Sequence, residues 1–184
     1  MLKSLFKTRP PLIRRAEAVG DPLYAAVAAQ ARQPAFYTVL GVADRIDARF
    51  ELYTLHALLL ILRLRDEDAE GGGAGAQAAQ SLFDVYVSAL DNVLRELGVG
   101  DISMARKMRN LGEALYGRMT AYEGPLRAGD QGALATHLAR NVFESAEPER
   151  GEALAAYALA ARSALANQSF AEVLNQPHWP EISA

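Results

Sequence analysis

The chain has 184 residues, of which 51% are hydrophobic, and this is enough to bury one sizeable core. Its formal net charge of −3 argues against a nucleic-acid binder that works through overall positive charge, and no DNA partner is expected. The absence of cysteine excludes disulfides, thiolate zinc sites and cysteine nucleophiles, and it suits a reducing cytoplasm.

The first segment, residues 1–20, is predicted to be a basic, flexible arm. Residues 1–16 contain no acid, and their cations are Lys3, Lys7, Arg9, Arg14 and Arg15. A solvated tail is the favoured interpretation of this composition. The alternative is a weak anchor to anionic lipid or RNA, since each basic residue close to an anionic membrane contributes roughly 1 kcal/mol. The arm lacks the long apolar stretch and the cleavage site of a secretory signal.

Helical patterns begin at DPLYAAVAAQARQ, where Asp21 is a candidate cap and Pro22 fits the first helical turn. Residues 34–41 predict a short turn or helix. The stretch 47–65 then predicts a long helix that is apolar on nearly all sides, which is typical of a central buried helix. Its most apolar run, 57–62, is much shorter than the about 20 residues that a membrane span needs.

His56 lies within this apolar helix. We predict a core histidine that is hydrogen-bonded to a neighbour, because no nucleophile pattern accompanies it. The three histidines of the chain show no metal-binding spacing, and the sequence lacks Gly-x-Ser-x-Gly, dinucleotide glycine and His-Glu-x-x-His motifs. No enzymatic activity, metal or cofactor is therefore predicted.

The acidic, glycine-rich stretch 66–76 is predicted to be a loop, because consecutive glycines are costly inside a helix. Helical periodicity resumes at residues 79–98. The apolar stripe of this helix comprises Leu82, Phe83, Tyr86, Val87, Leu90, Val93, Leu94 and Leu97. Asp84 and Asp91 lie on its polar side, where a solvated or salt-bridged face is favoured over a metal site.

The next helix is predicted over about 102–127. Its packing seam repeats at steps of three or four residues and comprises Met104, Met108, Leu111, Leu115, Met119, Tyr122 and Leu126. Arg106 and Arg109 lie off this seam, and Lys107 and Arg118 lie at its border. Only Arg109 has an acid four positions ahead, so local pairing leaves this positive charge available. Two interpretations stay open: a docking edge for another molecule, and exposed cations without a specific role.

Further helices are predicted after Asp130, which can cap the first of them, and after Pro148, with SFAEVLNQ adding a last turn or two. Residues 177–184 are predicted to form an irregular tail. No sustained alternation of apolar and polar residues supports a strand. The chain is therefore predicted to be all-α: a single-domain bundle of about six to eight helices over residues 21–176, with a central near-fully apolar helix.

A resemblance to a known family covers about residues 22–144, which is most of the domain, and it depends on a set of motifs. They are Arg49-Phe50-Glu51 with Leu55-His56, Leu82-Phe83-Asp84, the run RELGVGD from Arg95 to Asp101, Lys107-Met108, Tyr116-Gly117-Arg118, Ala121-Tyr122 and LARNVF at 138–143. Together they resemble the ubiquinol–cytochrome c chaperone family, and their residues are similar to those of bacterial members. The alanine-rich C-terminal region and the glycine-rich loop are the least family-like parts.

This resemblance implies a helical assembly factor that binds newly made cytochrome b and helps to build ubiquinol–cytochrome c reductase. Residues 21–176 would be its chaperone domain, placed in the cytoplasm at the periphery of the inner membrane. Mitochondrial relatives work with a small partner protein and near the ribosomal exit. The small partner is not carried over to this chain, and a ribosome contact stays open.

The charge pattern and the resemblance lead to a hypothesis for a client-binding edge. It comprises Met104, Arg106, Lys107, Met108, Arg109, Tyr116, Arg118 and Tyr122. An apolar surface would hold client helices, while cations would guide acidic groups or lipid. Two other classes of function are alternatives: a membrane-surface module that binds anionic lipid without a dedicated client, and an enzyme with an unrecognised helical site.

Overall fold

The computed structural model describes residues 19–68, 73–96 and 101–183, except for the side chains of residues 101–105 and 108. All regular structure in these ranges is helical, which confirms the predicted all-α class. In chain order the elements are α2 (Gly20–Ala31), α3 (Pro34–Thr38), α4 (Ile46–Asp66), α5 (Ala74–Glu96), α6 (Asp101–Ala128), α7 (Gln131–Val142), the 3-10 helix η1 (Pro148–Gly151), α8 (Glu152–Ala166) and α9 (Phe170–Asn175). Within these ranges, none of the helices is long and apolar enough to cross a membrane.

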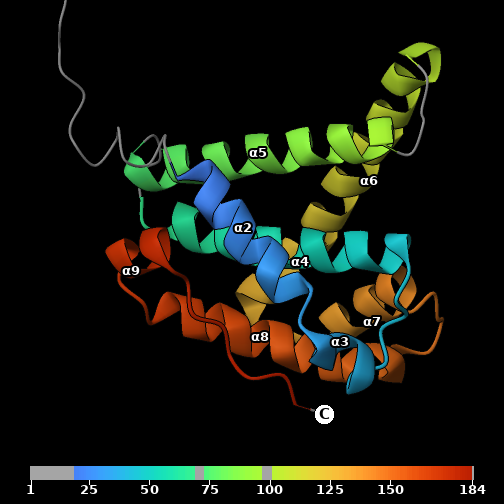
Figure 1. The fold of residues 1–184 in the computed structure, drawn as a ribbon. Coiled ribbons are helices and arrows are strands. Elements are labelled where there is room, and N and C mark those ends of the chain that lie inside the picture. Colours follow the sequence, from blue (N-terminus) through green and yellow to red (C-terminus); the bar gives the residue numbers. More distant parts are fainter. Residues whose placement is uncertain (1–18, 69–72, 97–100, 184) are drawn as a thin grey trace, which may run out of the picture.

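Helix α4 runs through the middle of the bundle and contacts α2, α5, α6, α7 and α8 (Figure 1). It extends one residue beyond the predicted 47–65 at each end. Every residue from Thr54 to Leu64 is buried. Because a fully buried leucine contributes about 1.5–3 kcal/mol, the leucines of this stretch supply much of the free energy that holds the surrounding helices together.

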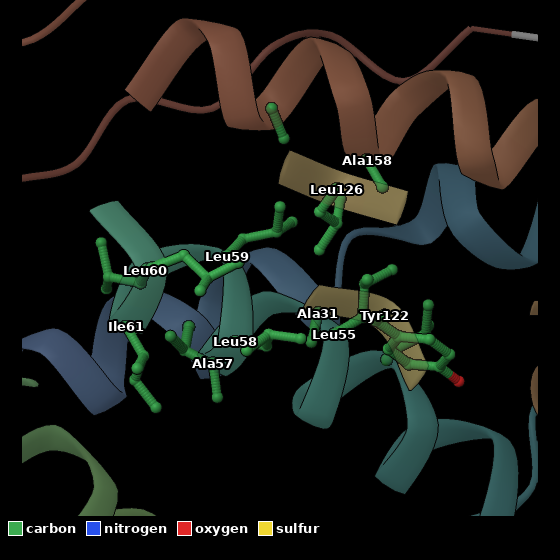
Figure 2. Packing of buried hydrophobic residues seen from close by; sticks show 14 of the residues in the cluster. Ala31, Leu55, Ala57, Leu58, Leu59, Leu60, Ile61, Tyr122, Leu126 and Ala158 are labelled. Carbon is green, nitrogen blue, oxygen red and sulfur yellow. The ribbon is translucent and has the colours of Figure 1, made fainter. Parts of the chain in front are cut away.

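Side chains from distant parts of the chain meet on α4. Figure 2 shows Tyr122 and Leu126 of α6 near Leu55 and Leu59 of α4, with Ala158 of α8 close by. All five side chains are almost completely buried. They hold the second half of α6 in the bundle, whereas Figure 1 shows the first turns of α6 extending beyond α5.

A polar network lies inside this core and links three helices. The Nδ1 atom of His56 donates to the Leu52 carbonyl at 2.7 Å, and its Nε2 atom accepts from the Tyr157 hydroxyl at 2.9 Å. The Gln30 side-chain amide donates to the same hydroxyl at 3.0 Å. Trp179 packs edge-on against the imidazole, with ring centroids 5.3 Å apart. The prediction of a hydrogen-bonded core histidine is confirmed.

The predicted loop at 66–76 is too long, because α4 ends and α5 begins inside it. The Asp68 carboxylate accepts from the backbone N–H of Ala76 at 2.7 Å and satisfies a free donor at the start of α5. Gly75 permits the two helices to approach closely, since a Cβ there would lie 2.1 Å from the Leu64 carbonyl oxygen. Packing against α4 therefore starts α5 earlier than local propensity predicts.

Of the predicted caps, Asp130 is confirmed and Asp21 is wrong. The Asp130 side chain accepts from the backbone N–H of Ala133 at 2.9 Å at the start of α7. Helix α2 begins instead at Gly20, so Asp21 lies inside its first turn. A Cβ at Gly20 would lie 2.5 Å from the Ser81 hydroxyl oxygen, so close packing on α5 explains the glycine.

Candidate binding groove

The apolar stripe of α5 is covered less completely by other helices toward its end. Leu82 and Tyr86 are buried, whereas Leu90 and Leu94 are half-buried and Val93 is 44% exposed. The reason is that α5 and α6, although consecutive in sequence, make few contacts with each other. The second half of the stripe therefore forms one wall of a hollow.

We name this hollow the α5–α6 groove. It has a volume of about 650 Å³ and lies between α4, α5, α6 and the end of α7. Its apolar lining is Ile46, Phe50, Leu90, Val93, Leu94, Leu111 and Ala114. Its polar lining is Asp47, Glu51, Lys107, Asn110, Arg118, Arg140, Asn141 and Glu144. A volume of this order and a substantial apolar lining are typical of binding sites.

Three of the predicted cations lie on the first half of α6. Arg106, Lys107 and Arg109 are exposed, and none of them has an ion-pair partner in the described part of the chain. Only Lys107 lines the α5–α6 groove. Their role in binding stays a prediction, and only Lys107 stands at the edge of this hollow.

The prediction that Arg118 offers spare charge is wrong. Its Nε atom donates to both carboxylate oxygens of Glu51, at 2.5 and 2.7 Å, and the Glu51 side chain is only 4% exposed. Burial raises the pKa of Glu51, and the hydrogen bond and charge of Arg118 partly offset this. The guanidinium also lies over the Phe50 ring. Glu51 is far from Arg118 in sequence, so a search for partners four residues away could not find it.

The two predicted tyrosines have different environments. Tyr122 is completely buried, its hydroxyl accepts from the Asn141 side-chain amide at 2.9 Å, and burial raises its pKa. Its predicted place on a client-binding edge is therefore wrong, because its position on the packing seam turns it toward α4. Tyr116 is 75% exposed.

Tyr116 lines a second cavity, of about 560 Å³, on the other side of α6. The apolar part of this cavity includes Phe83, Val87, Leu115 and Met119. The side chains of the predicted site residues Met104 and Met108 lie outside the described residues. The same holds for the basic arm, with Lys3, Lys7, Arg9, Arg14 and Arg15.

Two parts of the groove were absent from the sequence prediction. Ile46 and Phe50 come from the start of α4, and Arg140 and Asn141 come from the end of α7. Only tertiary packing places these segments beside α5 and α6. Apolar periodicity placed Leu90 on the stripe of its helix, but it could not show that Phe50 and Leu90 line the same hollow.

The lining of the groove offers apolar contact, amides and charges of both signs. Among the described residues, no group of His, Asp and Glu side chains is placed to hold a metal ion. A hollow with this mixed lining combines apolar contact with polar side chains that can fix the orientation of a bound group.

Comparisons with known proteins agree with this architecture. The family model described as Ubiquinol-cytochrome C chaperone matches residues 38–179. The crystal structure of the Cbp3 homolog from Brucella abortus is similar to this fold, with a TM-score of 0.79 and 31% sequence identity over 92% of each chain. A search of curated proteins found no match.

Proposed function

The chain belongs to the ubiquinol-cytochrome C chaperone family, and we propose that it binds newly synthesised cytochrome b through the α5–α6 groove. The family membership supports a role in the assembly of ubiquinol–cytochrome c reductase. In this proposal the protein acts by binding and not by catalysis. It covers apolar segments of its client until the client enters the membrane or the complex.

The incompletely covered second half of the α5 stripe is the observation that carries the proposal. A newly made membrane segment exposes apolar side chains to water, and covering them releases roughly 25 cal/mol for each Å² buried. Val93 of α5 and Ile46 of α4, at 44% and 62% exposed, are apolar side chains from two helices that line the groove. Exposed apolar side chains that gather in a hollow are typical of an interaction site.

A glutamate in place of Val93 tests the proposal. In the free protein the new carboxylate stays hydrated, so the free energy of unfolding should change little. In the complex it would be buried against an apolar client, which is unfavourable by a few kcal/mol. We expect Val93→Glu to reduce the capture of cytochrome b from solubilised membranes by at least about tenfold.

Val39 provides the matched control, because it is 48% exposed and lies outside the groove. Val39→Glu should capture cytochrome b as the unchanged protein does. If the folded Val93→Glu and Val39→Glu proteins capture cytochrome b equally, the α5–α6 groove is not the binding site. Arg118 is unsuitable for such a test, since its substitution would leave Glu51 buried and unpaired.

A second candidate function is binding to an anionic membrane surface. Arg106 and Arg109 favour it, because both are exposed, lack an ion-pair partner among the described residues and lie outside the groove. Such contacts would place the protein at the cytoplasmic face of the inner membrane. Two cations contribute only about 2 kcal/mol together, so they would assist docking and not sustain it alone.

A further inference from the structure

The polar side chains of the α5–α6 groove are distributed unevenly. The wall from α5 is entirely apolar and consists of Leu90, Val93 and Leu94. The amides and two of the cations come from other helices, of which α6 supplies Lys107 and α7 supplies Arg140. An occupant would therefore meet apolar side chains on one flank and hydrogen-bond donors with positive charge on the other.

Most of the acidic groups at the groove are already paired. Glu51 is held by Arg118, and Glu144 is held by Arg45 at 2.7 Å. Asp47, which lies in the first turn of α4, has no ion-pair partner among the described residues. A carboxylate at this position is stabilised by the partial positive charge of the helix start.

The positive groups at the rim are less well compensated. In the described part of the chain, neither Lys107 nor Arg140 has an ion-pair partner, and Arg140 is exposed like Lys107. The two come from different helices and line the same cavity. Asp47 is the single unpaired acid among the described residues that line the groove, so the rim has one uncompensated positive charge, and the cations that supply it belong to α6 and α7.

We propose that the groove prefers an apolar helical segment flanked by carboxylates to one flanked by cations. This inference rests on the proposed function and specifies the class of segment that the same groove accepts. The apolar face of the segment would lie on Leu90, Val93 and Leu94. Its carboxylate would approach Lys107 and Arg140, where charge-assisted hydrogen bonds are roughly twice as strong as neutral ones.

The discrimination comes from attraction and repulsion together. A carboxylate between two unpaired cations gains charge-assisted contacts, whereas a lysine in the same place meets like charge in a partly desolvated hollow. Apolar contact with the α5 wall is the same for both segments. The difference in affinity therefore reports the charged side of the groove alone.

The experiment uses two synthetic alanine–leucine helical peptides of equal length, one flanked by glutamates and the other by lysines. Each peptide carries a fluorophore, and its affinity for the full chain is measured by anisotropy at low ionic strength. We expect the glutamate-flanked peptide to bind at least about tenfold more tightly. Lys107→Gln should bring the ratio of affinities toward one, and Lys107→Glu should invert it.

Arg106→Glu is the matched control, because Arg106 is an exposed cation on the same helix that does not line the groove. It should leave the ratio of affinities unchanged. An equal effect of Arg106→Glu and Lys107→Glu would overturn the inference, since it would assign the preference to the overall field of α6. The inference would also be overturned if neither peptide bound.

The cytochrome b capture assay separates this inference from the proposed function. If capture of cytochrome b depends on Val93 but the two peptides bind with equal affinity, the proposed client is supported and the charge preference is overturned. A peptide preference that depends on Lys107, without capture of cytochrome b, would support the charge preference and overturn the proposed client.

Discussion

His56 shows how a polar side chain is accommodated in the apolar core. The Leu52 carbonyl can only accept a hydrogen bond, so Nδ1 carries the proton and Nε2 accepts from the Tyr157 hydroxyl. The neutral ring therefore satisfies both nitrogens. Complete burial lowers the pKa of His56 to about 4, and the hydrogen bond to Leu52 opposes this only in part.

This lowered pKa predicts a loss of stability in mild acid. In the unfolded chain the histidine takes up a proton near pH 6.5, whereas in the folded chain it does so near pH 4. Between these values the unfolded state binds more protons, so the free energy of unfolding falls as the pH falls. The loss attributable to His56 is about 3 kcal/mol, fully present near pH 4 and absent above about pH 6.5.

Urea unfolding at several pH values checks this expectation. His56→Gln should be less stable than the unchanged protein near neutral pH, because it disturbs the contacts with Leu52 and Tyr157. It should then lose less stability on acidification, since glutamine does not titrate. Parallel pH profiles of the two proteins would show that His56 does not control the acid sensitivity.

Residue-level predictions succeeded where the environment follows from the residue's own helix. His56 lies in an apolar run, and this alone indicates burial and a hydrogen-bonded neutral ring. Arg118 was misassigned because its partner, Glu51, comes from another helix, whereas Tyr122 was misassigned although its place on the predicted packing seam already indicated burial. Charge pairing inside a helix is visible in sequence, whereas pairing across helices depends on how the helices cross.

Glycines have opposite roles in two helices of this chain. Gly75 is required at the start of α5, because a Cβ would lie 2.1 Å from the Leu64 carbonyl oxygen of α4. Gly117 is exposed in the interior of α6, and nothing lies within 4 Å of the place where its Cβ would be. The packing of the described residues therefore explains Gly75 and leaves Gly117 as a local weakness in α6.

Alanine substitutions at these two positions should change stability in opposite directions. Gly117→Ala should raise the free energy of unfolding by about 0.5–1 kcal/mol, because alanine has the higher helix propensity and meets no obstacle. Gly75→Ala should lower it by about 1–3 kcal/mol, because α4 and α5 would have to separate. Thermal or urea unfolding measures both, and a gain in stability from Gly75→Ala would contradict the close approach.

The bounds of whole helices were predicted well where the apolar periodicity continues over many residues. The stretches 47–65 and 102–127 differ from α4 and α6 by one residue at each end. The start of α5 was placed too late, because the glycine-rich stretch has low helix propensity and the compensating contacts with α4 are tertiary. Leu82 and Tyr86 of the predicted stripe are buried, and Leu97 lies outside the described residues. The exposure of Val93 was not predicted, because it depends on how the helices pack.

The distribution of charge over the molecule differs from its net value. The formal net charge is −3, yet residues 1–16 contain five cations and no acid, and Arg106, Lys107 and Arg109 add exposed positive charge on α6. The exposed Arg49 and Arg95 are instead paired with Asp44 and Asp91. A negatively charged protein can therefore approach an anionic surface through particular regions. The sequence alone identifies the regions rich in cations, but it does not show which of these cations form ion pairs.

Vesicle flotation tests whether unpaired cations guide the protein to membranes. The protein should float with vesicles that contain anionic lipid, should not float with neutral vesicles, and should be released by salt. Replacing Arg106 and Arg109 by glutamine should lower the partition coefficient by about tenfold or more, since each contributes about 1 kcal/mol. Replacing Arg49 and Arg95 changes the net charge equally but removes cations that are already paired, so its effect should be much smaller. Equal effects would mean that the membrane senses only net charge, and absence of flotation from anionic vesicles would remove the membrane-surface function.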